Sequence, residues 1–194
     1  AKGTSITVNA LVDYNVDPNI DPETGETIIA SDFKVNKEQA STLTDEEVIT
    51  RSNAKAWVTT TGANVPITNV DKSSVKAERG VYPVTLKTAK NTTITINIIV
   101  DYTTDPVVDP VNKESIIASD FTLNKDEATN ITNEMAISKA SAYAWNLTDG
   151  ASVAITDVDV SNVKVERGVY SVTFATAKGT SITVNALVDY NVDP

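Results

Sequence analysis

The chain contains no cysteine and no histidine. Without cysteine it has no disulfide bond and no thiolate metal site, and without histidine it lacks the side chain most often used in proton transfer. It also has no serine in a nucleophile-elbow context and no Gly-rich phosphate loop. These absences predict that the protein is not an enzyme and needs no cofactor.

Positive charge and long apolar runs are scarce as well. Sixteen Lys and Arg residues stand against 26 Asp and Glu residues, which gives a formal net charge of −10. Such a chain cannot neutralise a row of phosphates, and an anionic membrane surface repels it. No apolar run approaches the roughly 18 residues of a transmembrane helix. We therefore expect no nucleic-acid partner and no direct membrane insertion.

The chain does contain a long internal repeat. Residues 1–18 read AKGTSITVNALVDYNVDP and recur letter for letter at residues 177–194, while residues 89–106 read AKNTTITINIIVDYTTDP. The three segments start 88 residues apart, and the alignment between them has no gap. A fixed long period indicates an array of like modules, so it favours two domains over one and predicts adjacent repeats as partners.

Each module is predicted to end in a β-hairpin. Apolar and polar residues alternate along residues 94–102 and 182–190, which is the period of a half-buried strand. A second alternating segment precedes each of them, and the connectors are Ala-Lys-Asn and Ala-Lys-Gly. Asn or Gly suits the positive φ of a tight turn. The same strand at residues 1–14 lacks a preceding partner, so we expect it to dangle or to pair with a neighbouring molecule.

These hairpins and the Asp-Pro pairs set the predicted boundaries. Asp-Pro pairs favour extended, stiff backbone, which is typical of a linker. We assign residues 1–18 to the last strand of a preceding repeat plus linker, 19–102 to repeat 1, 103–106 to a linker, and 107–194 to repeat 2 with C-terminal linker residues.

The interior of each module predicts short strands and one short helix. Strands are expected at residues 27–35, 54–59 and 65–70 and at the equivalent places of the second copy. Thr44-x-x-Glu47 is a capping box for a helix, and in the second copy Met135 replaces the glutamate after Thr132. The predicted fold class is all-β, with two tandem Ig-like antiparallel β-sandwiches that each carry a short helix.

The terminal hairpins also resemble a known family. GVYPVTLKTAKNTTITINIIVDY and GVYSVTFATAKGTSITVNALVDY, with IIASDF near the start of each unit, are similar to tandem bacterial Ig-like repeats of Gram-positive, Listeria-type cell-wall-anchored adhesins. The resemblance implies an extracellular location on the bacterial cell surface, with cell-wall anchoring in the full-length protein. It also implies a non-catalytic stalk that projects a binding region from the cell wall.

Two other roles stay open beside the stalk, namely multivalent binding and an accessory domain of a wall-active or polysaccharide-active enzyme. The repeats could bind a host protein or glycan multivalently, and Lys76, Glu78 and Arg79 with their second-copy counterparts are the shared exposed cluster. Lys90 and Lys178 recur in turns. An intramolecular isopeptide bond, which is common in Gram-positive stalk domains, needs a lysine at a core-facing strand position, so these positions disfavour one.

Aspartates in the linkers are the one candidate metal site. Oxygen ligands suit Ca²⁺, but their spacing matches no known calcium loop, and a solvated run of Asp-Pro turns is the favoured explanation. We expect no metal. The candidate ligands, four residues apart in each linker, are Asp13, Asp17, Asp21, Asp101, Asp105 and Asp109.

Tryptophan marks one strand of each copy. Trp57 and Trp145 are predicted to be buried in the sandwich rather than to form a carbohydrate-stacking platform. The other expected buried positions are Ile29, Phe33, Val84 and Val100, with Ile117, Phe121, Val172 and Val188 in the second copy.

Overall fold

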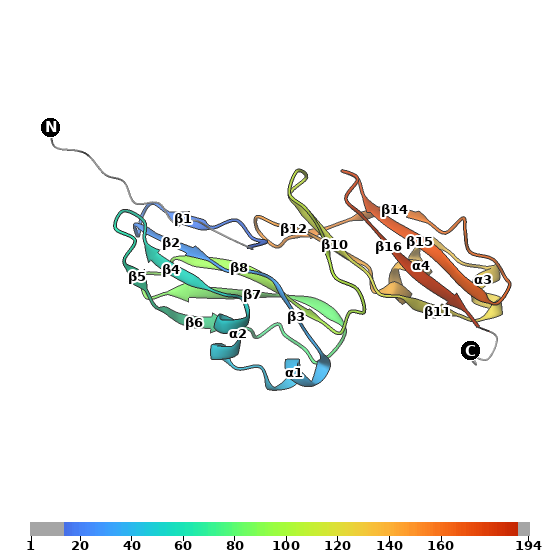
Figure 1. The fold of residues 1–194 in the computed structure, drawn as a ribbon, viewed down its shortest axis with the longest axis horizontal. Coiled ribbons are helices and arrows are strands. Elements are labelled where there is room, and N and C mark those ends of the chain that lie inside the picture. Colours follow the sequence, from blue (N-terminus) through green and yellow to red (C-terminus); the bar gives the residue numbers. More distant parts are fainter. Residues whose placement is uncertain (1–13, 190–194) are drawn as a thin grey trace. The chain divides into compact units, whose positions relative to one another are not determined.

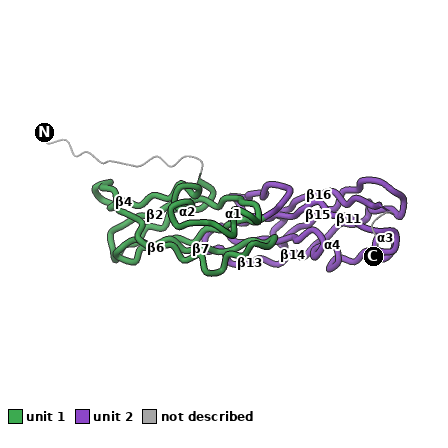
Figure 2. The backbone as a smooth tube through the Cα atoms, turned by 90° about the horizontal axis from the view of Figure 1, so that it is seen from below, with its two compact units in different colours: residues 1–100 green, residues 101–194 purple. Residues whose placement is uncertain are grey.

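The computed structural model describes residues 14–189 and divides the chain into two compact units, residues 1–100 and 101–194 (Figure 2). The predicted orphan strand at residues 1–14 lies outside the described residues except for its last residue, Tyr14.

Unit 1 is built from short strands with two short helices between the third and fourth (Figure 1). In chain order its elements are β1 (Asn19–Asp21), β2 (Glu26–Ile29), β3 (Phe33–Val35), α1 (Lys37–Thr42), α2 (Asp45–Arg51), β4 (Lys55–Val58), β5 (Asn64–Val65), β6 (Ile67–Asp71), β7 (Gly80–Thr88) and β8 (Thr93–Val100).

Unit 2 has the same elements in the same order. They are β9 (Val107–Asp109), β10 (Glu114–Ile117), β11 (Phe121–Leu123), α3 (Lys125–Thr129), α4 (Asn133–Ala140), β12 (Tyr143–Asn146), β13 (Ser152–Val153), β14 (Ile155–Asp159), β15 (Gly168–Thr176) and β16 (Ser181–Val188).

The strands of each unit form two four-stranded sheets. In unit 1 the orders are β1-β2-β4-β5 and β3-β8-β7-β6, and unit 2 repeats them as β9-β10-β12-β13 and β11-β16-β15-β14. All pairs are antiparallel except β3 with β8 and β11 with β16, which are parallel. The predicted fold class, all-β with two tandem sandwiches and short helices, is confirmed.

The core of each unit lies between its two sheets. In unit 1, Ile28 and Ala56 from one sheet belong to the same buried cluster as Val84, Leu86 and Ile96 from the other. Alternate residues of a strand point to opposite faces, so each sheet supplies every second side chain to this cluster. Unit 2 has its own cluster, with Ile116, Ala144, Val172, Phe174 and Val184 in the corresponding places.

The prediction of one strand at residues 27–35 is wrong, because these residues form two strands in different sheets. β2 pairs with β4, whereas β3 pairs with β8. The chain crosses between them at residues 30–32, where Ser31 N–H donates to Ser52 O and the Asp32 carboxylate accepts from Asn97 N–H. These bonds replace ladder hydrogen bonds and hold the crossing in place. The strand predicted at residues 115–123 divides in the same way, into β10 and β11.

Both predicted helices are present, and each is preceded by a helix that the sequence analysis missed. α2 begins after Thr44 with the predicted capping box to Glu47, and α4 begins after Thr132 without one. The missed helices are α1, capped by Asn36, and α3, capped by Asn124. Asn is as good an N-cap as Thr, and a Gln or Glu three residues later was a readable signal.

The terminal hairpins have the predicted geometry. β7 pairs with β8 from Gly80↔Val100 to Lys87↔Thr93, and the turn closes with Thr88 N–H donating to Thr92 O. The turn residues Asn91 and Gly179 have φ values of 73° and 91°, as the Asn or Gly at this position predicted.

A glycine opens each of these hairpins beneath a tyrosine ring. A Cβ on Gly80 would lie 2.9 Å from the Tyr82 ring, so a larger residue there would force the ring to shift. The Tyr82 hydroxyl donates to Glu78 O at 3.1 Å, and Tyr170 repeats this bond with Glu166 O at 2.9 Å. The tyrosines therefore have a structural role at the start of each hairpin.

The two tryptophans lie on the sheet face that points away from the core. Their neighbours Ala56 and Ala144 occupy the core positions, so alternation turns the indoles outward. Trp145 is nevertheless buried, at 1% exposed, and lies 6.0 Å from the Tyr143 ring, whereas Trp57 is only half-buried. The prediction of burial is thus confirmed for Trp145 and wrong for Trp57. Phe33 is half-buried too, and the remaining predicted residues are buried: Ile29, Val84, Val100, Ile117, Phe121, Val172 and Val188.

The separate cores predict that the units unfold separately. Phe174 and its counterpart Leu86 are both 0% exposed. Phe174→Ala should lower the stability of unit 2 by about 3–5 kcal/mol because it leaves a cavity in that core alone. Calorimetry should show one transition shifted and one unchanged, and Leu86→Ala should shift the other one. A single transition that moves in both variants would contradict the independence of the cores.

Candidate functional site

The described candidate ligands of the linkers do not form a cation site. Asp17 and Asp105 are exposed, Asp101 is half-buried with a φ of 60°, and Asp13 lies outside the described residues. Asp21 and Asp109 end strands β1 and β9. Across residues 14–189 no group of three or more acidic side chains could hold a metal ion.

Asp21 and Asp109 instead close tight turns. Asp21 Oδ1 accepts from Glu23 N–H at 2.9 Å and from Thr24 N–H at 3.2 Å. Asp109 Oδ1 accepts from Val111 N–H and Asn112 N–H, both at 3.0 Å. The hydrogen bonds from the backbone lower the pKa of both aspartates, despite the opposing effect of desolvation. Their carboxylates are therefore already used in fixing the turn between the first two strands.

Next to this turn, unit 1 contains a buried carboxylate that the sequence analysis did not single out. Glu26 on β2 is 3% exposed, and its Oε2 accepts from Thr88 Oγ1 at 2.7 Å and Thr92 Oγ1 at 3.2 Å. Lys90 Nζ lies 3.5 Å from Glu26 Oε1 and donates to Thr24 O at 3.3 Å. Thr88, Lys90 and Thr92 belong to the β7–β8 hairpin, so this cluster joins the two sheets at one end of the sandwich.

Unit 2 repeats the cluster with one substitution. Glu114 is 2% exposed and accepts from Thr176 Oγ1 at 2.7 Å, and Lys178 Nζ lies 3.0 Å from its Oε1. Asn112 stands where unit 1 has Thr24, and its Nδ2 donates to Asp109 Oδ2 at 2.7 Å and Lys178 O at 3.1 Å. We name the two sets, Asp21-Glu26-Thr88-Lys90-Thr92 and Asp109-Glu114-Thr176-Lys178-Thr180, the carboxylate clasps.

The clasps favour ionised glutamates. Hydrogen bonds from Thr88 and Thr92, with the charge of Lys90, lower the pKa of Glu26 against the cost of desolvation. Burial by itself would raise the pKa of Glu114, but the bonds from Thr176 and Lys178 and the charge of Lys178 outweigh it, so this pKa is also lowered. Surrounding hydrogen-bond donors therefore stabilise both carboxylates as anions, so each glutamate has a structural role.

The clasps also bear on the isopeptide alternative. Lys90 and Lys178 remain 59% and 53% exposed at their side chains and face a carboxylate. The described contacts of these lysines are those of an ion pair.

The linker residues before β1 and β9 are bound to the module that follows them. The Tyr14 hydroxyl donates to Asn53 O, and the Tyr102 hydroxyl donates to Ser141 O, both at 2.7 Å. Asn53 and Ser141 follow helices α2 and α4 with φ values of 50° and 49°. Tyr102, which the sequence analysis placed at the end of the first module, therefore lies in the second unit.

The residues after Tyr102 strengthen this attachment. Thr103 N–H donates to Ser119 Oγ at 3.2 Å, and Thr103 Oγ1 accepts from Asp120 N–H at 3.1 Å. Thr104 donates its hydroxyl to Ala118 O. Only Asp101 separates Tyr102 from Val100, the last residue of β8. The predicted linker at 103–106 is thus bonded to unit 2 along its first half.

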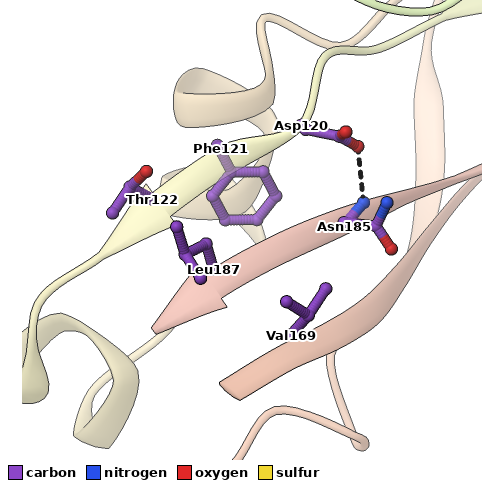
Figure 3. A pocket seen from close by; sticks show the side chains of 6 residues that line it. All are labelled: Asp120, Phe121, Thr122, Val169, Asn185 and Leu187. Atoms are coloured by element: carbon purple, nitrogen blue, oxygen red, sulfur yellow. Dashed lines mark hydrogen bonds between the residues drawn. The ribbon is translucent and has the colours of Figure 1, made fainter. Parts of the chain in front are cut away.

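Unit 2 also has a shallow apolar hollow on the outer face of β15 and β16 (Figure 3). Its volume is about 330 Å³, and its lining residues are Asp120, Phe121, Thr122, Val169, Asn185 and Leu187. Val169 and Leu187 are directly paired and are 63% and 42% exposed. The Asp120 carboxylate accepts from Asn185 N–H at 2.8 Å, which fixes β11 beside β16.

The shared exposed cluster is accessible in unit 1, but one of its residues in unit 2 forms a local ion pair. Lys76, Glu78 and Arg79 are exposed just before β7. In the second copy Arg167 forms an ion pair with Asp189 at 2.7 Å. Arg167 of this cluster is therefore engaged in a local ion pair in unit 2.

Comparisons with known proteins add no relative. No family model matches the chain, and no curated protein matches it. Among the described residues no helix is both long enough and apolar enough to cross a membrane.

The clasps predict an acid-sensitive contribution to stability. Because folding lowers the pKa of Glu26 and Glu114, their contribution is present above the ordinary value of 4.5 and is lost as the pH falls through the folded value. Glu26→Gln with Glu114→Gln should lower the melting temperature at neutral pH and reduce its loss on acidification. The matched control is Glu46→Gln with Glu134→Gln, exposed at equivalent helix positions, which should change the profile far less. Equal profiles for both double variants would refute the role of the clasps.

The turn aspartates predict that folding is independent of divalent metal. Their carboxylates already accept backbone N–H groups, so millimolar Ca²⁺ should leave the melting temperature unchanged. A rise of several degrees that a chelator reverses would show that the linker aspartates bind the ion after all.

Proposed function

We propose that the chain is a non-catalytic spacer from a bacterial cell-surface adhesin, a stalk that projects a binding region from the cell wall. The observation that carries this proposal is the attachment of the linker. Tyr102, Thr103 and Thr104 are hydrogen-bonded to the module that follows, and one residue separates them from the last strand of the module before. A connector this short limits hinge motion, which is what a stalk requires.

The repeated architecture supports the same function. Each copy is a complete sandwich with its own core, so copies add length without needing a new core across the junction. The clasp and the tyrosine bond recur in both copies at equivalent residues. The net charge of −10 favours solubility of a long array.

The proposal is tested by measuring how firmly the modules are joined. Because the chain has no cysteine, Thr60→Cys with Thr148→Cys places one spin label on an exposed loop of each unit. A stiff spacer should give a narrow distance distribution in electron double resonance. Tyr102→Ala should broaden it, because the hydroxyl bond to Ser141 O and the buried ring are both lost.

The matched control is Tyr14→Ala, which removes the same bond in front of unit 1 and does not touch the connector between the labels. It should leave the distribution narrow. A broad distribution in the unsubstituted protein would contradict the spacer function, and so would a narrow one that Tyr102→Ala leaves unchanged.

A further inference from the structure

The turn between β12 and β13 carries the only Asp-Gly pair of the chain, which has no Asn-Gly pair. Asp149 is exposed, and Gly150 has a φ of 70°, a backbone conformation that favours glycine. Because Gly150 has no Cβ, no side chain shields the peptide nitrogen that follows the Asp149 carboxyl group. That nitrogen is therefore open to react with the carboxyl carbon of Asp149 when the turn opens.

The hydrogen bonds of this turn set how the reacting groups lie. Asp149 Oδ1 accepts from Ala151 N–H at 3.0 Å, so the carboxyl group is turned forward along the chain, toward the Gly150 nitrogen. Gly150 N–H itself donates to Asn146 O at 2.9 Å. This second bond must open before the nitrogen can react, so the reaction should be slow and should follow local opening of the exposed turn.

Unit 1 has the same turn without the reacting carboxyl group. Gly62 N–H donates to Val58 O at 2.8 Å. Thr61 Oγ1 accepts from Ala63 N–H at 3.3 Å. Thr61 thus supplies the acceptor that Asp149 supplies in unit 2, but its side chain has no carboxyl carbon for the nitrogen to attack. The difference between the copies lies inside each turn and is set by the sequence.

We propose that Asp149 and Gly150 form a modification site that converts to isoaspartate and marks unit 2 alone as the chain ages. The Gly150 nitrogen bonds to Asp149 Cγ, the carboxyl hydroxyl leaves with the proton of that nitrogen as water, and a cyclic succinimide results. Water then adds at the α-carbonyl carbon and breaks its bond to the nitrogen. The chain now continues through the Asp149 side chain, and the α-carboxylate is the new side group. Mass and charge are restored, and water is the only reagent.

The product should loosen the turn. The isoaspartyl link adds a methylene to the backbone of a turn that the bond from Asn146 N–H to Ala151 O closes at 2.8 Å. β13 is only two residues long, and its Val153 packs against the unit 2 core. Weaker closure should therefore lower the stability of unit 2 and leave that of unit 1 unchanged. The inference rests on this turn and does not require the spacer function.

The test is ageing of the full chain for weeks at physiological temperature and neutral pH. An isoaspartate O-methyltransferase with labelled S-adenosylmethionine is the probe, because it esterifies the new α-carboxylate. Label should increase with age, fragmentation should place it at Asp149, and a species that has lost one water molecule should appear transiently. In calorimetry the transition of unit 2 should fall with age, and that of unit 1 should not.

The two copies supply the matched variants. Asp149→Thr gives unit 2 the turn of unit 1, so it should abolish the label and leave both transitions of the fresh protein in place. Adding Thr61→Asp to this variant should move the label and the loss of stability to unit 1. Label that does not increase with age, or that survives Asp149→Thr, overturns the proposal. A unit 2 transition that does not shift in labelled, aged protein overturns the predicted loosening.

Discussion

The long terminal hairpin is the pairing on which the rest of each module depends. β7 and β8 are the longest strands of unit 1, and their inner faces supply six of the fourteen buried residues of its described core cluster. β3 is added to β8 in parallel, β6 is added to β7, and the turn between β7 and β8 supplies the donors of the carboxylate clasp. Loss of this pairing would remove one whole sheet and the cover of the other, so neither sheet could keep its apolar face from water.

The clasp and the linker tyrosine each provide a hydrogen-bond partner for a polar group at the edge of this sandwich. A buried carboxylate is costly unless donors surround it, and Thr88, Thr92 and Lys90 surround Glu26 with donors from the opposite sheet. The tyrosine at the entry donates to a backbone carbonyl directly after a helix, at Asn53 in unit 1 and at Ser141 in unit 2. The clasp thus joins the two sheets through polar atoms, and the tyrosine joins the linker to its module in the same way. Both add directional contacts that non-directional core packing does not provide.

The repeat makes the two copies a natural comparison. Equivalent residues have the same neighbours in the strand ladders, but Trp57 differs from Trp145 and Ile99 from Leu187 in exposure. These differences gather on outer faces, whereas the equivalent core residues Val84 and Val172 are both 0% exposed. Core burial is thus a property of the module that both copies share.

The sequence by itself determined the period, the all-β class, the terminal hairpin, its positive-φ turn and the Thr44–Glu47 capping box, because these depend on local alternation and turn chemistry. Tertiary structure alone decided the division of residues 27–35 between two sheets, since an apolar run does not show which sheet each half joins. It also decided the outward direction of the tryptophans, because a one-residue difference in register exchanges core and surface. The clasp was invisible for the same reason: Glu26 and Thr88 are brought together only when the sheets stack, and no short-range pattern links them.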